Sequence, residues 1–265
     1  MTEPAEELVL YRLEGQVAVL TLNRPGRKNA WTIPLQRRYL GLLEQCDRDP
    51  AVRAIVITGA GSAFCPGADT AELTVYTQTG DFNPEMAEIE QPDHYPLEVG
   101  KPMIAAINGA CAGIGLMQTL MCDVRIAVTG ARMTTAFARR GLPALHGSAW
   151  LLPRLIGLSR ATELLLSGRT FTTDEAAGLG LIHQVVPAGE ALTVALAYAA
   201  DLAANCSPAS IKTMKAQLRA AAGQDVLTSI ANGLELERRA LASADFAEGV
   251  RSFVERRPAR FPAPH

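Results

Sequence analysis

Three short apolar segments, two of them ending in glycine turns, constrain the fold of this 265-residue chain most strongly. They are residues 54–58, 103–107 and 124–128, and turn residues follow the first two at Gly59 and Gly109. Short runs that are apolar throughout predict strands buried on both faces, and the helical segments between them predict parallel pairing with crossovers. The pattern therefore indicates an α/β fold, in which ligands bind near the carboxyl ends of the strands.

The segments around these strands extend the pattern. Residues 9–13 and 17–22 are apolar or alternating, which predicts a hairpin. Residues 33–46 space their apolar side chains as a helix does, with Thr32 as the N-cap. Residues 74–100 have no consistent period and contain several glycine, proline and aspartate residues, which predicts a loop or a poorly packed helix over a site.

The pattern changes after Pro187, where strand-like segments end and helical spacing takes over. We expect helices over residues 188–204, 208–222, 226–241 and 246–255. The chain is therefore predicted to consist of an α/β core, residues 1–190, and a C-terminal helical region, residues 191–265.

Charge and cysteine content argue against several classes of function. The chain has 25 Lys and Arg against 27 Asp and Glu, and the mixed signs along it argue against a nucleic-acid partner. The five cysteines are widely spaced, which is typical of free thiols in a reducing compartment rather than of disulfides or metal ligands. No signal-peptide pattern or long apolar run is present, so we expect a soluble cytoplasmic protein that does not enter a membrane.

The turn after the first buried strand is one candidate for chemistry. In residues 62–69 the backbone N–H groups lack strand partners, so they are available to a ligand oxygen, and Asp69 is placed to cap a following helix. Taken alone, this segment is explained more simply by an ordinary strand-to-helix turn.

Residues 107–116 are a second candidate, because a strand there enters a glycine-rich turn and then an apolar helix. Glycines allow a ligand to approach the backbone closely, and the helix start offers unpaired N–H groups at the positive end of its dipole. The arrangement suits an anionic oxygen. A dinucleotide-binding fingerprint is excluded, because the third glycine and the acidic residue at the required spacings are missing.

Several separate segments resemble the enoyl-CoA hydratase/isomerase (crotonase) superfamily, in order and over nearly the whole chain. They are residues 22–30, 63–69, 101–109, 121–123, 167–169 and 176–181. The resemblance implies an α/β, crotonase-like spiral of ββα units with a C-terminal helical region that assembles a homotrimer or a dimer of trimers. It also implies an acyl-CoA thioester as substrate, so coenzyme A enters with the substrate and we expect no separate cofactor and no metal. The fold hosts many reactions.

The resemblance assigns binding roles to two stretches of backbone and one basic turn. The N–H groups of Ala68 and Ile114 would form an oxyanion hole for the thioester carbonyl, which stabilises the enolate-like charge of the transition state. Arg27, Lys28 and Ala30 match the family segment beside the phosphates and adenine of coenzyme A. From the residues alone, a solvated basic turn is the preferred explanation of the last group.

The carboxylates that the family uses for proton transfer are missing. Water addition to an enoyl thioester needs one group to activate water and another to protonate the α carbon. The family's two glutamates fall at Met117 and Phe137, and the acidic position of thioester dehalogenases and related members falls at Leu145. These three apolar side chains predict a surface for a hydrocarbon chain, and standard hydratase activity is not expected.

Other side chains are candidates for the missing role. His146 adjoins Leu145 on the loop before a helix and titrates near neutral pH, although a structural histidine is the alternative. Asp69 is a candidate substrate contact, with helix capping as the alternative. Residues 74–100 also carry acidic side chains and a histidine, which fit either a closing segment or a solvated loop: Asp81, Glu85, Glu88, Glu90, Asp93 and His94.

The C-terminal tail completes the expectations. Arg260 and Phe261 match a region that, in relatives, approaches the coenzyme A of a neighbouring subunit, and a frayed basic terminus is the alternative. We therefore expect a protein that binds an acyl-CoA thioester and stabilises its enolate without the usual glutamates. A non-catalytic acyl-CoA carrier is the main rival hypothesis, and an RNA-binding relative is disfavoured by the net charge of −2.

Overall fold

The strands of the computed structural model form two sheets, within a description that covers residues 5–79 and 89–262. One sheet has six strands in the order β1-β2-β3-β5-β7-β10, and the other has four in the order β4-β6-β8-β9. The strands are β1 (Val9–Glu14), β2 (Val17–Leu22), β3 (Ala54–Gly59), β4 (Ala63–Cys65), β5 (Met103–Ile107), β6 (Ala110–Ala112), β7 (Val124–Val128), β8 (Arg132–Thr134), β9 (Phe171–Thr172) and β10 (Gln184–Val186).

From β3 to β8, consecutive strands alternate between the two sheets. In the larger sheet β3, β5 and β7 pair in parallel, and the strand that follows each of them, β4, β6 or β8, pairs in parallel in the smaller sheet. A helix follows β4 and another follows β6. This repetition is the spiral of ββα units that the sequence predicts, and the predicted hairpin is the antiparallel pair β1–β2.

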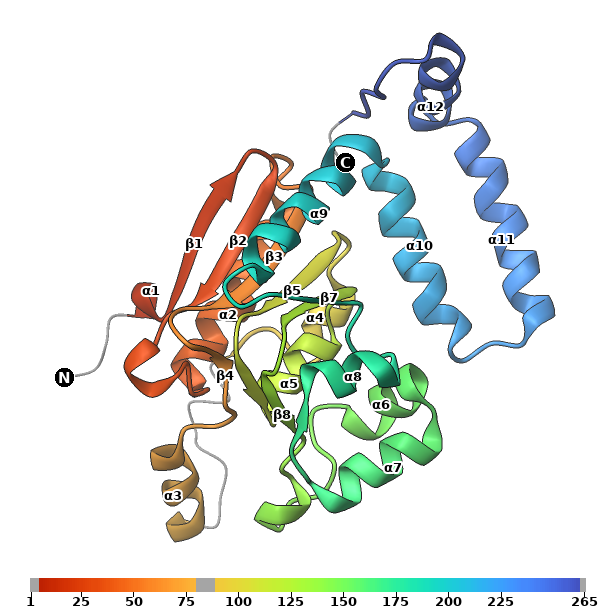
Figure 1. Cartoon of the computed structure of the whole chain (residues 1–265). Helices are drawn as coiled ribbons and strands as arrows, with labels where there is room; N and C mark the ends of the chain where they lie inside the picture. Colours follow the sequence, from red (N-terminus) through yellow and green to blue (C-terminus); the bar gives the residue numbers. More distant parts are fainter. Residues whose placement is uncertain (1–4, 80–88, 263–265) are drawn as a thin grey trace.

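The helices of the first half pack on or between these sheets, except α3 (Thr70–Thr79), which stands away from them (Figure 1). They are α1 (Ala5–Leu8), α2 (Ile33–Arg48), α3 (Thr70–Thr79), α4 (Tyr95–Glu98) and α5 (Ile114–Leu120), with a short 3-10 turn, η1 (Pro25–Arg27). The α2 helix begins as predicted, because the side chain of Thr32 accepts a hydrogen bond from the Leu35 N–H. Its apolar face, which includes Leu35 and Leu43, is fully buried in the main core.

The helices of the second half divide into a packed group and a projecting group. They are η3 (Ala138–Arg140), α6 (Ser148–Ile156), α7 (Leu158–Ser167), α8 (Thr173–Leu179), α9 (Ala191–Asn205), α10 (Pro208–Ala221), α11 (Val226–Leu241) and α12 (Ala244–Glu255). A stripe of alanines, including Ala195 and Ala199, lets α9 lie on the larger sheet. By contrast, α10, α11 and α12 extend away from both sheets (Figure 1), and within the described residues α10 and α11 bury no side chain. The four predicted C-terminal helices are confirmed, whereas the domain boundary at residue 190 stays a prediction.

The segment predicted as a loop or poorly packed helix is partly helical. Residues 70–79 form α3 and residues 95–98 form α4, while residues 80–88 lie outside the described residues. The apolar residues of α3 do not fall on one face, which is why the sequence gives no helical period there. Figure 1 shows α3 standing away from the sheets.

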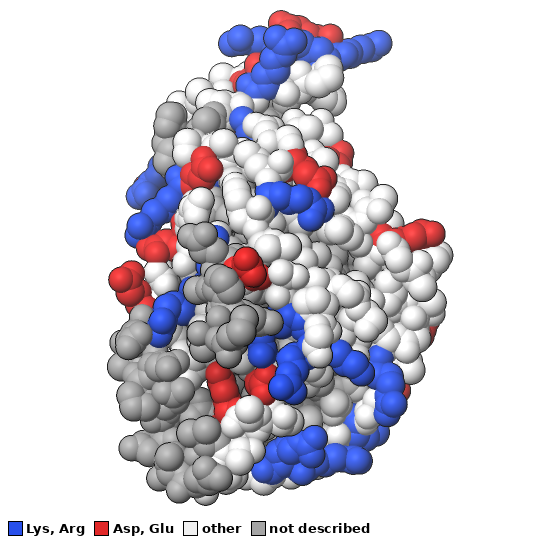
Figure 2. Space-filling model, turned by 90° about the vertical axis from the view of Figure 1, so that its left-hand side faces the viewer, with Lys and Arg blue, Asp and Glu red and all other residues white. Residues whose placement is uncertain are grey.

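The surface charges and the state of the cysteines can be compared with the predictions made from composition. Figure 2 shows acidic and basic side chains interspersed with broad uncharged areas on the face drawn. All five cysteines are free, and only Cys206 among them is not fully buried. No helix in the described part of the chain is both long and apolar enough to cross a membrane.

Candidate active site

The two turns singled out in the sequence lie side by side. Parallel pairing of β4 with β6 aligns Cys65 with Cys111, so the chain leaves both strands at the same edge. A Cβ atom placed on Gly113 would lie 3.7 Å from the Cα of Gly67. The residues that follow these two glycines, Ala68 and Ile114, are therefore neighbours across the two turns.

Trp31 fixes the direction of the first turn. Its N–H donates to the carbonyl of Gly67 at 2.8 Å, and its carbonyl accepts from the N–H of Asp69 at 2.8 Å. These bonds lie on either side of Ala68, and successive N–H groups of an extended segment point in opposite directions. The Ala68 N–H therefore points away from Trp31, toward the side on which β6 lies.

The second turn presents the N–H of a helix start. Gly113 has φ of 51° and ψ of −126°, donates its own N–H to Thr134, and is followed directly by α5. The first N–H groups of a helix have no partner within it and lie at the positive end of its dipole. The structure thus places Ala68 and Ile114 in adjacent turns, and their role as backbone donors for one anionic oxygen stays a prediction.

Close packing beneath the turns leaves no room for side-chain change. A Cβ atom on Gly115 would lie 2.6 Å from the Cβ and the carbonyl oxygen of Cys65, so a glycine is required where α5 crosses β4. Burial raises the pKa of Cys65 to about 12 and raises that of Cys111 well above its ordinary value. Neither thiol is therefore a thiolate nucleophile near neutral pH.

The basic turn is held against the β3–β4 connection by one buried amide. Asn29 is fully buried, and its Nδ2 donates to the carbonyls of Ala60 at 2.9 Å and Ala63 at 2.8 Å. Lys28 and Asn29 both adopt left-handed backbone conformations, which turns the chain sharply. Arg27 and Lys28 remain exposed, so two cations stand beside the turn that carries Ala68.

Asp69 has protein partners at both carboxylate oxygens. One accepts a hydrogen bond from the Ala71 N–H at 3.0 Å, as the predicted helix cap would, and the other pairs with Arg24 Nη1 at 3.0 Å. Arg24 also donates to the carbonyl of Ala30, which is buried. Burial opposes the charged form of Asp69, but these hydrogen bonds lower its pKa below the ordinary value. The predicted cap is confirmed, and a substrate contact for Asp69 stays a prediction.

The three apolar side chains singled out in the sequence, Met117, Phe137 and Leu145, belong to one hydrophobic cluster. Met117 is fully buried, Phe137 is 6% exposed, and Leu145 packs against the same core. A cavity of about 280 Å³ lies beside them. Its lining is made by Asp93, His94, Leu97, Met121, His146, Gly147, Trp150 and Leu151.

His146 meets an acidic side chain at the edge of this cavity. Its Nδ1 lies 3.5 Å from Oδ2 of Asp93, and the Asp93 Oδ1 accepts a hydrogen bond from Gln36 Nε2 at 2.6 Å. The Gln36 Oε1 in turn accepts from the indole N–H of Trp31 at 3.0 Å. The contact with His146 lowers the pKa of Asp93, although partial burial opposes the shift.

The sequence does not predict the hydrogen-bonded group formed by Asp93, Gln36 and Trp31. Asp93 is far from the other two residues in the chain, and no local spacing connects it to them. Glu90 is exposed, and His94 pairs with Glu98 at 3.1 Å. The other acidic candidates of this segment lie outside the described residues: Asp81, Glu85 and Glu88.

The C-terminal tail contacts its own chain. The carbonyl of Phe261 accepts a hydrogen bond from Arg53 at 2.7 Å, and the N–H of Arg260 donates to Glu248 at 2.7 Å. These bonds hold residues 260 and 261 against the body and α12. A role for Phe261 at a neighbouring subunit stays a prediction.

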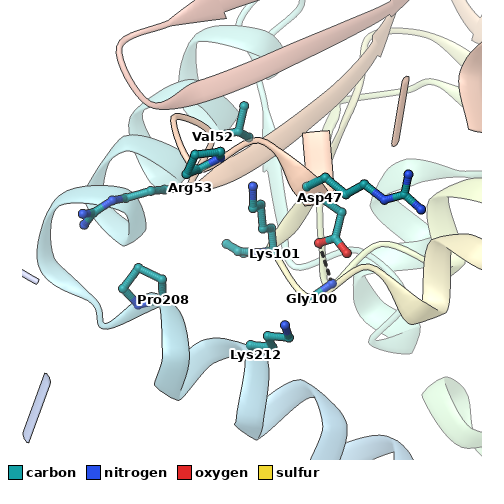
Figure 3. Close-up of a pocket in the computed structure, with 10 residues that line it drawn as sticks. Asp47, Val52, Arg53, Gly100, Lys101, Pro208 and Lys212 are labelled. Atoms are coloured by element: carbon teal, nitrogen blue, oxygen red, sulfur yellow. Dashed lines mark hydrogen bonds between the residues drawn. The ribbon is translucent and has the colours of Figure 1, made fainter. Parts of the chain in front are cut away.

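A second hollow, drawn in Figure 3, lies at the opposite ends of the strands. It has a volume of about 290 Å³ and lies where β3 and β5 begin, beside the start of α10. Lys101 Nζ donates to the carbonyls of Cys46 and Asp49, and Asp47 accepts from the Gly100 N–H. The buried ammonium group of Lys101 therefore connects the end of α2 to the segment just before β5. Within residues 5–79 and 89–262, no group of three or more His, Cys, Asp or Glu side chains is arranged to hold a metal ion.

Comparisons with known proteins agree with this geometry. A family model described as enoyl-CoA hydratase/isomerase matches residues 12–264. The 1,2-epoxyphenylacetyl-CoA isomerase of Escherichia coli is 33% identical over 260 residues, which cover 96% of this chain and 98% of that protein. The mevalonyl-coenzyme A hydratase of Beauveria bassiana is 34% identical over 253 residues, covering 91% and 89%.

Solved structures extend the likeness to the whole fold. The crystal structure of an enoyl-CoA hydratase from a Polaromonas species matches with a TM-score of 0.88 at 29% identity, covering 96% of this chain and 99% of that one. The spiral of ββα units and its paired turns define an α/β protein of the crotonase type. The chain belongs to the enoyl-CoA hydratase/isomerase family.

Proposed function

We propose that this protein binds an acyl-CoA thioester and stabilises the enolate of its acyl group with the N–H groups of Ala68 and Ile114. The observation that supports the proposal is the adjacency of the two turns, which is expected if two backbone donors serve one oxygen. Fixed donors of this kind lower the energy of a transition state in which negative charge grows on the carbonyl oxygen.

The coenzyme A part of the ligand would lie along the basic turn. Arg27 and Lys28 are exposed, and buried Asn29 holds them next to the β3–β4 connection. Their cations suit phosphate oxygens, and Ala30 leaves the surface beside them without a bulky side chain. The proposal requires no cofactor beyond the coenzyme A of the substrate.

The proton-transfer group of this site is proposed to be His146. Met117, Phe137 and Leu145 occupy the positions where the family and its relatives have carboxylates, and none of the three can carry a proton. His146 is 23% exposed at its side chain, lines the cavity, and lies near Phe137, with 6.4 Å between the two ring centroids. An imidazole at this position can act as a general acid–base group.

A non-catalytic acyl-CoA carrier is the second candidate. It is favoured by the burial of Met117 and Phe137 in the hydrophobic core, because such a surface holds a hydrocarbon chain without acting on it. The two candidates share the same ligand and differ only in turnover.

A product screen separates them. Purified protein is incubated with enoyl-CoA thioesters of several chain lengths, products are identified by mass spectrometry, and binding is measured by calorimetry. The enzyme predicts a hydrated or isomerised product that disappears in His146→Ala. Binding with no product would support the carrier, and the absence of binding would contradict both.

Assembly into a homotrimer, or a dimer of trimers, is proposed from the projecting helices. Large apolar side chains on α10 and α11 are exposed, among them Leu218 at 75% and Leu227 at 75%. Exposed apolar surface of this extent marks a protein interface. Light scattering should give a trimer or hexamer for the wild type and a smaller species for Leu227→Glu, whereas a wild-type monomer would contradict the proposal. Phe261 and Arg260 would then adjoin a neighbour's ligand.

A further inference from the structure

We propose that Asp93 and His146 form the acid–base pair of this site, with His146 contacting the substrate and Asp93 positioning it. The inference rests on the proposed function and adds to it a positioning residue and a reaction class. Asp93 is not one of the positions at which the resemblance to the family places a carboxylate.

The geometry of the pair leaves one imidazole nitrogen for the substrate. Asp93 Oδ2 faces Nδ1 of His146 at 3.5 Å, which directs Nε2 to the other side of the ring. A carboxylate in this position fixes the orientation of the imidazole and stabilises its protonated form. The imidazole also lies beside Phe137, which replaces a family glutamate, with the two ring planes inclined by 43°.

Asp93 is itself held in place by Gln36 of α2, which contacts Trp31 beside the turn that carries Ala68. Gln36 donates to Asp93 at 2.6 Å and accepts from the indole of Trp31 at 3.0 Å. Trp31 forms the backbone bridge to Ala68. Hydrogen bonds that join Trp31 to Gly67 and Asp69, Trp31 to Gln36 and Gln36 to Asp93, with the Asp93–His146 pair, therefore connect the turn that carries Ala68 to His146.

The backbone at His146 is unusual in a way that fits a functional position. His146 has φ of 50°, a left-handed conformation that is uncommon for a side-chain-bearing residue, and Gly147 follows with φ of 73°. Such conformations cost free energy and persist where the surrounding structure requires them. Both residues line the cavity together with Asp93.

One acid–base group favours moving a proton within the substrate over adding water to it. His146 would take a proton from the carbon next to the thioester carbonyl, and the electron pair of that C–H bond would move to the carbonyl oxygen held by Ala68 and Ile114. Return of the same proton to the γ carbon shifts the double bond from the β,γ to the α,β position. Atoms and electrons balance without a second reactant, whereas hydration needs a further group to activate water.

Among the residues that the structure describes, further titratable or charged groups line the surroundings of the pair or lie close to them. His94 lines the same cavity and pairs with Glu98, and Arg154 stacks on Trp150 with its guanidinium carbon 3.9 Å from the ring centroid. Glu98 lies outside the cavity lining, so it provides a matched control for Asp93.

The test is the isomerisation of trans-3-hexenoyl-CoA and trans-3-octenoyl-CoA to their conjugated products, followed by absorbance across a range of pH. His146→Gln should lower kcat by about 100-fold or more, which is the usual contribution of a general acid–base group. Asp93→Asn should lower kcat by at least about tenfold, with little change in KM, and should alter the pH profile. Asp93→Glu should recover part of the loss, and Glu98→Gln should match the wild type.

The outcomes separate this inference from the proposed function. If the wild type isomerises the probes and Asp93→Asn keeps its rate and pH profile, the pair is overturned while the acyl-CoA enzyme stands. If the wild type binds the probes without isomerising them, the carrier hypothesis replaces the enzyme and the pair has no catalytic role. Circular dichroism and unfolding curves for each variant establish that a lost rate does not come from a lost fold.

Discussion

The two halves of the candidate site use different chemical groups, backbone N–H groups in one and side chains in the other. The proposed carbonyl-binding half consists of backbone N–H groups at Ala68 and Ile114, which follow glycines in two adjacent turns. The proposed acyl half consists of side chains, and there the resemblance to the family predicts that Met117, Phe137 and Leu145 stand at carboxylate positions. The two halves differ in what sets their chemistry: the packing of a turn sets the direction of a backbone N–H group, whereas proton transfer depends on the identity of a single side chain.

The largest effect is expected from disturbing the backbone half. Gly113 has φ of 51° and ψ of −126°, which a residue with a Cβ atom adopts only at high cost, so Gly113→Ala should displace the Ile114 N–H. Loss of one oxyanion donor typically lowers kcat by about 100-fold to 1,000-fold. Steady-state isomerisation kinetics provide the measurement.

Gly130→Ala is the matched control, because Gly130 also has positive φ, of 70°, but is not part of either turn. Both variants should lose some stability from backbone strain, and only Gly113→Ala should lose the reaction. Equal rates in the two variants would contradict the role of the β6–α5 turn.

A gain is expected from adding acid–base chemistry to the side-chain half. Leu145 is only partly buried, so Leu145→Asp places a carboxylate beside His146 without removing a fully buried core residue. Hydration of crotonyl-CoA should rise by up to about 100-fold, the lower end of what a general acid–base group contributes. Product formation by mass spectrometry checks it, with Leu145→Asn as the uncharged control. An equal rise in both variants would show that polarity, not proton transfer, is responsible.

A smaller effect on stability is expected from the ion pair under the carbonyl-binding half. The side chains of Asp69 and Arg24 are 9% and 14% exposed, and the pKa of Asp69 is lowered. A lowered carboxyl pKa contributes stability above the unfolded-state value of about 3.9 and loses it as the pH falls through the folded-state value. Asp69→Asn should therefore cost about 1–3 kcal/mol of unfolding free energy at pH 7.

Urea unfolding at a series of pH values tests this. The difference between wild type and Asp69→Asn should shrink as the pH falls below about 4, since protonation removes the same charge. The exposed Asp201, changed to Asn, should show little effect at any pH. A difference that does not depend on pH would mean that Asp69 acts through packing and capping alone.

The smallest effect is expected from the corresponding carboxylate of the side-chain half. The Asp93 side chain is 44% exposed, so solvent screens its pairing with His146 despite its lowered pKa. Asp93→Asn should change the unfolding free energy at pH 7 by less than about 1 kcal/mol, and the change should vanish as the pH falls below the Asp93 pKa. A larger loss in urea unfolding would indicate that Asp93 is mainly structural.

Much of the fold could be predicted from local sequence pattern. The strands β3, β5 and β7 are short, apolar runs, and α2 has both a regular apolar face and a capping threonine. These signals depend on residues that are close in the sequence. The helix α3 was predicted only as one alternative, a loop or a poorly packed helix, because its apolar residues have no helical period.

The candidate site was predictable only in part. The resemblance predicted Ala68 and Ile114, because each lies in a glycine turn that is a short, continuous sequence motif. The contact between Asp93 and His146 could not be predicted from a local motif. It depends on how the segment before β5 folds back onto the loop before α6. Gln36 was equally hidden, because its polar side chain sits on the buried side of α2 and its role appears only with its partners.

The most direct test of the central claim is solvent deuterium exchange into a saturated acyl-CoA thioester, measured by mass spectrometry in D₂O. This measurement detects enolate formation beside the carbonyl without requiring the natural reaction. We predict exchange at the carbon next to the thioester carbonyl with the wild-type protein, and its loss in His146→Gln and Gly113→Ala. Binding of the thioester without any exchange in the wild type would contradict the claim that this site stabilises an enolate.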